Sequence, residues 1–295
     1  MPHAPGASSR PGGGGVSGHK VGFSLEAIEV CYNRRVMLEE TAHAAETSGD
    51  GGIHIALAAE RLGEFIGVPI TNTLITSWIV VALLIALAVL IGLNLKMVPG
   101  RVQTLVEESF SYVYNYIEET LENKQLARRF FPLLLTLFLF IFTANILEFT
   151  PGIGSIGFFH GDAFTPLLRS VNTDLNVTLA LSIIAVVVVE IAGVVALGFF
   201  RYASKFINFS SPLNFAVGLI ELVSEISRLV SFSFRLFGNI FAGEVLIAVA
   251  VFFLPYIVPV PLMAFELFIG FIQAVVFAML ALFFIKLAVM PHDSH

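Results

Sequence analysis

Charged residues are scarce in this chain. Only 13% of its 295 residues are charged, while 57% are hydrophobic, whereas an average soluble protein is about a quarter charged and about half apolar. A soluble fold needs charged residues on most of its elements to cover its surface, and here long stretches carry one ionisable residue or none. The shortage excludes a soluble enzyme and a disordered scaffold, and it indicates a membrane protein.

Basic residues and cysteine are also few. The chain has 16 Lys and Arg against 22 Asp and Glu, for a net charge of -6, so it offers no basic surface for nucleic acid. Its single cysteine, Cys31, cannot form an internal disulfide and makes a poor metal site. We therefore expect no nucleic-acid partner, no metal and no cofactor.

Long apolar segments are what the sequence does contain. Five of them are long enough to cross a hydrocarbon core, which takes about 20 helical residues. They span residues 74–95, 130–149, 175–200, 213–254 and 257–290. The sequence thus predicts an all-α integral membrane protein with five membrane-crossing helices, and we assign residues 71–295 to this membrane domain.

The first 70 residues have a different composition. Residues 1–20 are mostly Gly, Pro and Ser, which is typical of disorder. Residues 21–68 carry charges every few positions, and we expect short interfacial helices there. Residues 1–70 are therefore predicted to be a poorly ordered or interfacial extension.

A sixth helix is predicted between the first two apolar segments. Apolar residues recur there at steps of three and four, which is the period of a helix with one apolar face: Val102, Leu105, Val106, Phe110, Val113, Ile117 and Leu121. Such an amphipathic helix can lie on the membrane surface. The alternative is a helix that packs on another protein.

The basic residues of the loops predict the orientation, because cytoplasmic loops collect Lys and Arg. The loops around the amphipathic helix and after the third segment hold Lys96, Arg101, Lys124, Arg128, Arg129, Arg201 and Lys205. The opposite side has Arg169 alone. We therefore expect the N-terminus outside and the C-terminus, near Lys286, in the cytoplasm.

The fourth and fifth segments are unusually long. Residues 213–254 contain no proline and would form a helix of roughly 60 Å, about twice the thickness of the hydrocarbon core. Such a helix must tilt strongly or break. We interpret the two segments as long, slanted, antiparallel helices, with a bend at Gly238 or Gly243 as the alternative.

Ionisable residues within or at the margins of these segments are costly, at about 2.5–3.5 kcal/mol each. They are Glu148, Glu190, Glu221, Glu225, Arg228, Arg235, Glu244 and Glu266. Their cost argues for ion movement, or for charges that pair with each other and hold helices together. For Glu190 a helix-pairing role and a water-facing role are both open.

Helical spacing sorts these residues. One stripe of the fourth segment carries Glu221, Glu225, Ser227, Arg228, Ser231, Arg235 and Asn239. Glu244 is nine residues beyond Arg235, on the opposite face of the helix, while Glu266 and Gln273 share a face of the fifth segment.

The chemistry of these side chains suggests their roles. An arginine stays protonated, so the role of Arg235 must be electrostatic. Desolvated carboxylates that lie close together can share a proton, which is the chemistry of a proton relay.

Residues 227–244, SRLVSFSFRLFGNIFAGE, together with Gln273, resemble the a subunit of F-type ATP synthases. The stretches NILEFTPG and TDLNVT extend this resemblance over about residues 70–290. It implies a proton-conducting stator subunit of the bacterial plasma membrane whose long tilted helices wrap the c ring. Its partners would be the c ring, b-type peripheral stalk subunits, the rest of the ATP synthase and lipid, with catalysis outside this chain.

The resemblance also implies roles for single residues. Arg235 would be the essential arginine facing the c ring, with Gln273 close to it. The half-channel from the outer phase would be lined by Asn145, Glu148, Asn239, Glu244 and Glu266, and the path to the cytoplasm by Ser227 and Ser231. Many relatives pair a histidine with a glutamate at the positions of Glu244 and Glu266, whereas this chain has glutamate at both.

Other classes of membrane protein fit less well. A stand-alone secondary ion transporter predicts internal repeats, and we find none. A haem protein would need paired histidines in the membrane segments, but all seven histidines lie outside them. A sodium-translocating version of the same subunit stays open, because the family places the ion-binding carboxylate on the c ring.

Overall fold

The computed structural model describes residues 61–65, 68–150, 157–160, 163–199, 202, 212–254 and 257–290. The predictions for residues 1–60 lie outside these ranges. Six helices form within them: α2 (Asn72–Leu93), α3 (Arg101–Leu121), α4 (Lys124–Glu148), α5 (Leu175–Leu197), α7 (Pro212–Phe253) and α8 (Pro259–Val289). All except α3 are long and apolar enough to cross a membrane. The predicted all-α membrane fold is confirmed.

Two short antiparallel hairpins accompany the helices. One joins β1 (Arg61–Phe65) to β2 (Val68–Thr71), and the other joins β4 (Gly157–His160) to β5 (Ala163–Pro166). The prediction of interfacial helices up to residue 68 is therefore wrong for β1 and the start of β2. Gly63 and Pro69 weaken a helix there, while β-branched residues favour extended backbone.

The amphipathic helix is confirmed as α3, and its two halves differ. Val102 and Leu105 in its first half are exposed, whereas Ile117 and Leu121 in its second half are buried against α4 and α8. Glu122 then takes a left-handed φ of 53° and α4 begins one residue after Asn123, whose side chain accepts hydrogen bonds from the first backbone N–H groups of α4. This cap starts α4 six residues earlier than its apolar run predicts.

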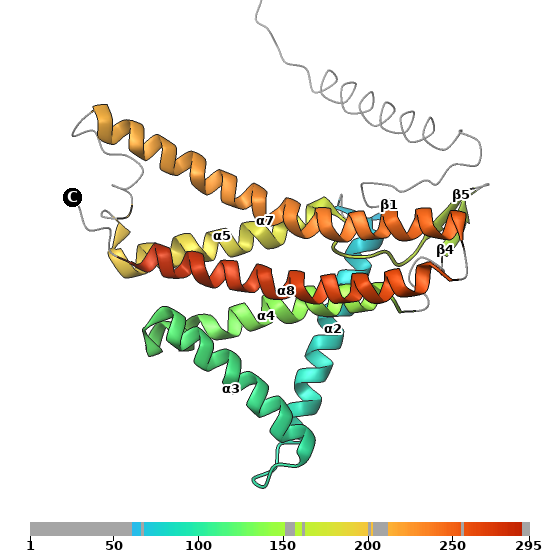
Figure 1. Cartoon of the computed structure of the whole chain (residues 1–295), viewed down its shortest axis with the longest axis horizontal. Helices are drawn as coiled ribbons and strands as arrows, with labels where there is room; N and C mark the ends of the chain where they lie inside the picture. The colour runs from blue at the N-terminus through green and yellow to red at the C-terminus, as the bar shows by residue number, and fades with distance from the viewer. Residues whose placement is uncertain are drawn as a thin grey trace, which may run out of the picture. The chain divides into compact units, whose positions relative to one another are not determined.

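Helix α8 lies at the centre of the packing. It contacts α4, α5 and α7, while α5 also packs against α7 (Figure 1). The core between these helices is apolar and includes Ile141 of α4, Leu236 of α7 and Phe277 of α8. Apolar side chains thus fill the space between the helices as well as cover the outer surface of the bundle.

Helix α7 is continuous through Gly238 and Gly243 over 42 residues, so no break occurs at either glycine. Figure 1 shows its amino-terminal part diverging from α8, while its carboxyl-terminal part runs beside that helix. The strong tilt of α7 and α8 in the membrane stays a prediction.

Polar contacts join the helices at both ends of the bundle. At one end, Thr73 at the start of α2 donates a 2.7 Å hydrogen bond to Asp174, and Ser170 donates one of 2.9 Å to Glu148 at the end of α4. We call this the loop end, after the segment 167–174. At the other end, Lys286 of α8 pairs with Glu122 at 2.9 Å, and we call it the α3 end.

Candidate ion path

The segment 167–174 carries a cluster of polar side chains at the loop end. Arg169, Ser170, Asn172, Thr173 and Asp174 are all buried, although they come from a connection between helices. Buried polar groups need hydrogen-bond partners, and these find them on α2, α4 and α7. We use the name loop-end cluster for Asn145, Glu148, Arg169, Ser170, Asn172, Thr173, Glu244 and Glu266.

Asn145 joins three parts of this cluster. Its amide donates a 2.9 Å hydrogen bond to the carbonyl of Gly270 on α8, and its oxygen accepts one of 2.6 Å from Asn172. A Cβ at position 270 would lie 3.0 Å from the Cβ of Asn145, so α4 and α8 meet closely here. Asn145 therefore positions the loop segment against two membrane helices.

Two carboxylates interact with one guanidinium, and a third carboxylate lies near them. Glu148 and Glu244 both interact electrostatically with Arg169, and Glu148 also interacts with Glu244 and Glu266. Thr173 lies within hydrogen-bonding reach of Glu244. Three ionised acids and one cation would leave an excess of negative charge, which bound protons would neutralise and water would solvate.

Glu266 lies against the backbone of α7. Its side chain is buried, and neither carboxylate oxygen has a hydrogen-bond partner among the described residues. A Cβ at position 243 would overlap the Glu266 carboxylate. A larger residue at 243 would displace this carboxylate, so Gly243 allows Glu266 of α8 to approach the helix that carries Glu244.

Asn239 and Gln273 form the next polar contact along α7. The Asn239 amide donates a 2.8 Å hydrogen bond to the Gln273 oxygen on α8. Gln273 is buried, and Asn239 follows Arg235 by one helical turn. The structure thus places Gln273 beside the neighbour of Arg235.

Arg235 lies on an open face of α7. Its side chain is exposed, and its polar contact in the described part of the chain is a 3.3 Å hydrogen bond from Nη2 to the Ser231 hydroxyl. Phe234 and Val230 on the same stretch of α7 are also exposed. An exposed guanidinium among apolar side chains would be costly if lipid covered this face.

A groove of about 220 Å³ lies on the other side of Arg235 from the loop-end cluster. It is lined by Ser224, Ser227, Arg228, Ser231, Phe232, Arg235, Leu280 and Phe284. The structure therefore brings Ser227, Ser231 and Arg235 together at one groove, while their roles in ion conduction stay predictions. We call this cavity the serine groove.

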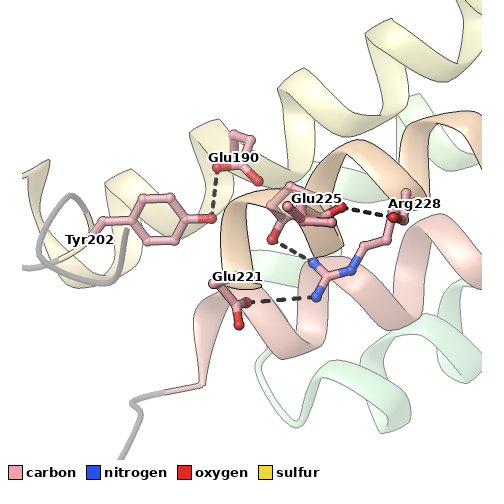
Figure 2. A network of polar contacts seen from close by, with 7 residues as sticks. Glu190, Tyr202, Glu221, Glu225 and Arg228 are labelled. Atoms are coloured by element: carbon pink, nitrogen blue, oxygen red, sulfur yellow. Dashed lines mark hydrogen bonds and ion pairs between the residues drawn. The ribbon is translucent and has the colours of Figure 1, made fainter. Parts of the chain in front are cut away.

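Arg228 connects the serine groove to two glutamates. It pairs with Glu225 at 2.6 Å and with Glu221 at 3.8 Å (Figure 2), and its guanidinium lies 4.9 Å from the ring centre of Phe284. Glu221, Glu225 and Arg228 therefore fit the alternative in which charged residues of the membrane segments pair with each other. The pairs lie within α7 rather than between helices.

The two polar groups are separated along α7. Ser227 precedes Glu244 by 17 residues, or about 25 Å of helix, and Arg235 lies between them.

The sequence did not single out Ser170 and Asn172, because short polar residues in a loop are common. Their place just before the stretch TDLNVT, residues 173–178, was the one available signal.

The comparisons with known proteins cover this whole arrangement. The sequence model of the family described as ATP synthase A chain matches residues 74–286. The chain belongs to this family. The matched range contains both the loop-end cluster and the serine groove, so the family assignment rests on the part of the chain that carries the polar residues.

Several ATP synthase a subunits are similar over most of their length. The subunit of Gloeobacter violaceus is 37% identical over 227 residues, which cover 76% of this chain and 86% of the relative. Those of Moorella thermoacetica and Geotalea uraniireducens are 31% and 32% identical, over 76% and 71% of this chain and 94% and 84% of their own lengths. As a member of the ATP synthase A chain family, this multi-pass membrane protein is a component of the F-type ATP synthase.

Proposed function

We propose that this chain is the proton-conducting stator subunit of an F-type ATP synthase, with two aqueous half-channels separated by Arg235. The observation that supports this is the division of its polar residues into two groups at different heights along α7. A continuous polar pore would let protons cross without work, whereas two offset half-channels require a carrier between them. The c ring would be that carrier, and b-type subunits would hold this chain in place.

Loop charges support an orientation for the two groups. Lys124, Arg128 and Arg129 open α4 at the α3 end, and basic residues are retained on the cytoplasmic side. The serine groove would then open toward the cytoplasm of a bacterium. The loop-end cluster would face the outer phase, with the N-terminus outside and the C-terminus inside.

Proton uptake from the outer phase would use the carboxylates of the loop-end cluster. Glu148, Glu244 and Glu266 are close enough to interact, and neighbouring acids that share protons can pass them stepwise. The Asn239 and Gln273 contact lies between this cluster and Arg235. Protons would leave Glu266 near there for a carboxylate of the c ring.

Arg235 would keep the two routes apart. Its permanent positive charge repels a proton that attempts to pass directly, and it favours the ionised form of a c-ring carboxylate that comes close. A ring carboxylate would release its proton into the serine groove, past Ser231 and Ser227. One charge moved through 100 mV supplies about 2.3 kcal/mol, which would drive rotation and ATP synthesis elsewhere in the complex.

Sided labelling of single cysteines tests the two half-channels. In complexes with Cys31 replaced by Ser, we expect a membrane-impermeant thiol reagent to reach Ser231→Cys from the cytoplasmic side only. We expect the reagent to reach Glu244→Cys from the outer side only. Val187→Cys, on an exposed apolar face of α5, is the control and should react from neither side.

Labelling of both sites from one side would contradict separate half-channels. Pumping measured with and without Na⁺ distinguishes the transported ion, because a proton path needs no sodium.

A further inference from the structure

Glu190 is an ionisable residue in α5 that the proposed half-channels do not use. Its Oε2 accepts a 2.9 Å hydrogen bond from the Tyr202 hydroxyl (Figure 2). Its Oε1 is buried and has no hydrogen-bond partner among the described residues. Ionisable residues in membrane helices are costly and usually functional, so a glutamate here with one unbonded carboxylate oxygen is a candidate functional group.

The chain folds back to bring Tyr202 to this carboxylate. Helix α5 ends at Leu197, and the next residue, Gly198, has a φ of 86° that suits glycine. The backbone N–H of Tyr202 donates to the Gly198 carbonyl at 2.9 Å. The Tyr202 ring is buried against Gly193, where an added Cβ would overlap it. Burial and the hydrogen bond to Glu190 raise the pKa of Tyr202 above its ordinary value. The hydroxyl therefore stays protonated and acts as a donor.

Among the described residues, two charged groups of α7 interact with Tyr202 besides Glu190. Tyr202 interacts electrostatically with Glu225 and Arg228, and Arg228 is shared between Glu225 and Glu221. In this half of α8 the ionisable residue is Lys286, which pairs with Glu122 instead. The two glutamates of α7 thus share the guanidinium, whereas the contact of Glu190 is a neutral hydroxyl.

This difference decides which contacts would break if each carboxylate took up a proton. Protonation of Glu225 would weaken a 2.6 Å ion pair and leave part of the charge of the half-buried Arg228 uncompensated. Protonation of Glu190 at Oε1 would leave the hydrogen bond from Tyr202 to Oε2 in place. No contact in Figure 2 has to break for Glu190 to become a neutral acid.

We propose that Glu190 is an additional proton acceptor on the route from the serine groove to the α3 end. This rests on the proposed function. A proton leaving the groove beside Arg228 binds Oε1 of Glu190, which becomes a neutral carboxylic acid. Water at the α3 end then removes the proton and restores the carboxylate. Tyr202 orients the carboxylate and does not itself ionise.

Two substitutions separate proton acceptance from a structural role. Glu190→Gln keeps an oxygen that can accept the hydrogen bond of Tyr202 but cannot take up a proton. Tyr202→Phe removes that hydrogen bond but keeps the carboxylate. The measurement is ATP synthesis and ATP-driven proton pumping by the complete complex in liposomes, as a function of pH on the α3 side.

We expect Glu190→Gln to slow both activities by roughly tenfold, which is less than the loss of an obligatory acid–base group, and to change their pH dependence. Tyr202→Phe should stay within about twofold of the unmodified complex, because the acceptor is still present. Normal rates in Glu190→Gln, or a larger loss in Tyr202→Phe than in Glu190→Gln, would overturn the proposal.

Subunit content of the purified complex shows whether each variant assembles. If Glu190→Gln does not assemble, Glu190→Asp decides, because it keeps a carboxylate: rates near those of the unmodified complex support the proposal and a tenfold loss overturns it. Arg235→Ala separates the two levels of the account. Blocked pumping in Arg235→Ala with normal Glu190→Gln overturns only the role of Glu190, whereas normal pumping in Arg235→Ala overturns the proposed function itself.

Discussion

Asn239 of α7 donates a 2.8 Å hydrogen bond to Gln273 of α8, and this contact lies between the loop-end cluster and the exposed Arg235. Gln273 is buried, so its oxygen depends on Asn239 for a partner there. The pair therefore fixes the register of α7 on α8 one turn away from the arginine. It couples the position of Arg235 to the packing of the fifth membrane helix.

The first prediction is that Asn239 and Gln273 act as a unit. Asn239→Ala and Gln273→Leu should each lower the thermal stability of the assembled complex, and the double variant should be little worse than either single one. We expect a coupling energy of about 1 kcal/mol, typical of a net hydrogen bond between neutral groups. Strictly additive losses would show that the contact contributes nothing.

A second prediction concerns the close approach at Gly243. Gly243→Ala places a methyl group where the Glu266 carboxylate lies, and this flexible end of the side chain can move aside at little cost in stability. We expect the Glu266 carboxylate to be displaced and the proton flux through the complex to fall clearly. Gly92→Ala on α2 is the matched control, since its new Cβ meets nothing within 4 Å. Equal proton flux in both variants would show that the close approach at Gly243 does not matter for conduction.

A third prediction follows from the pair of Glu122 and Lys286. The hydrogen bond and charge of Lys286 lower the pKa of the Glu122 carboxyl. A lowered pKa in the folded state stabilises the protein above the ordinary carboxyl pKa, and this contribution is lost as pH falls through the lowered value. Glu122 is solvent-exposed, so the effect should be small.

We therefore expect Glu122→Gln to melt slightly below the unmodified protein at neutral pH. The difference in Tm should disappear in acid, where the carboxyl is protonated in both states. A difference that grows as pH falls would mean that the ion pair does not stabilise the junction between α3, α4 and α8.

The helices were predictable from sequence because their physical signal is strong. Five apolar runs and the three- and four-residue steps of residues 101–121 depend on local composition alone. Helix ends were less predictable, since α4 begins at the cap formed by Asn123. The hairpin of β1 and β2 was missed because charged residues near position 61 gave no clear period.

The candidate site was predictable only in part. Spacing along one helix placed Ser227, Ser231 and Arg235 on one stripe, and the serine groove contains all three. The partners across helices, such as Asn172 for Asn145 and Tyr202 for Glu190, depend on how distant segments pack. No periodicity in a single segment carries that information.

ATP-driven proton pumping by complexes that carry Arg235→Ala tests the central claim most directly. Arg235→Lys, which keeps a positive charge without the planar guanidinium, and the unmodified complex are measured beside it. The account predicts that Arg235→Ala assembles and binds the c ring but shows no coupled pumping. Coupled pumping at the normal rate in Arg235→Ala would contradict it.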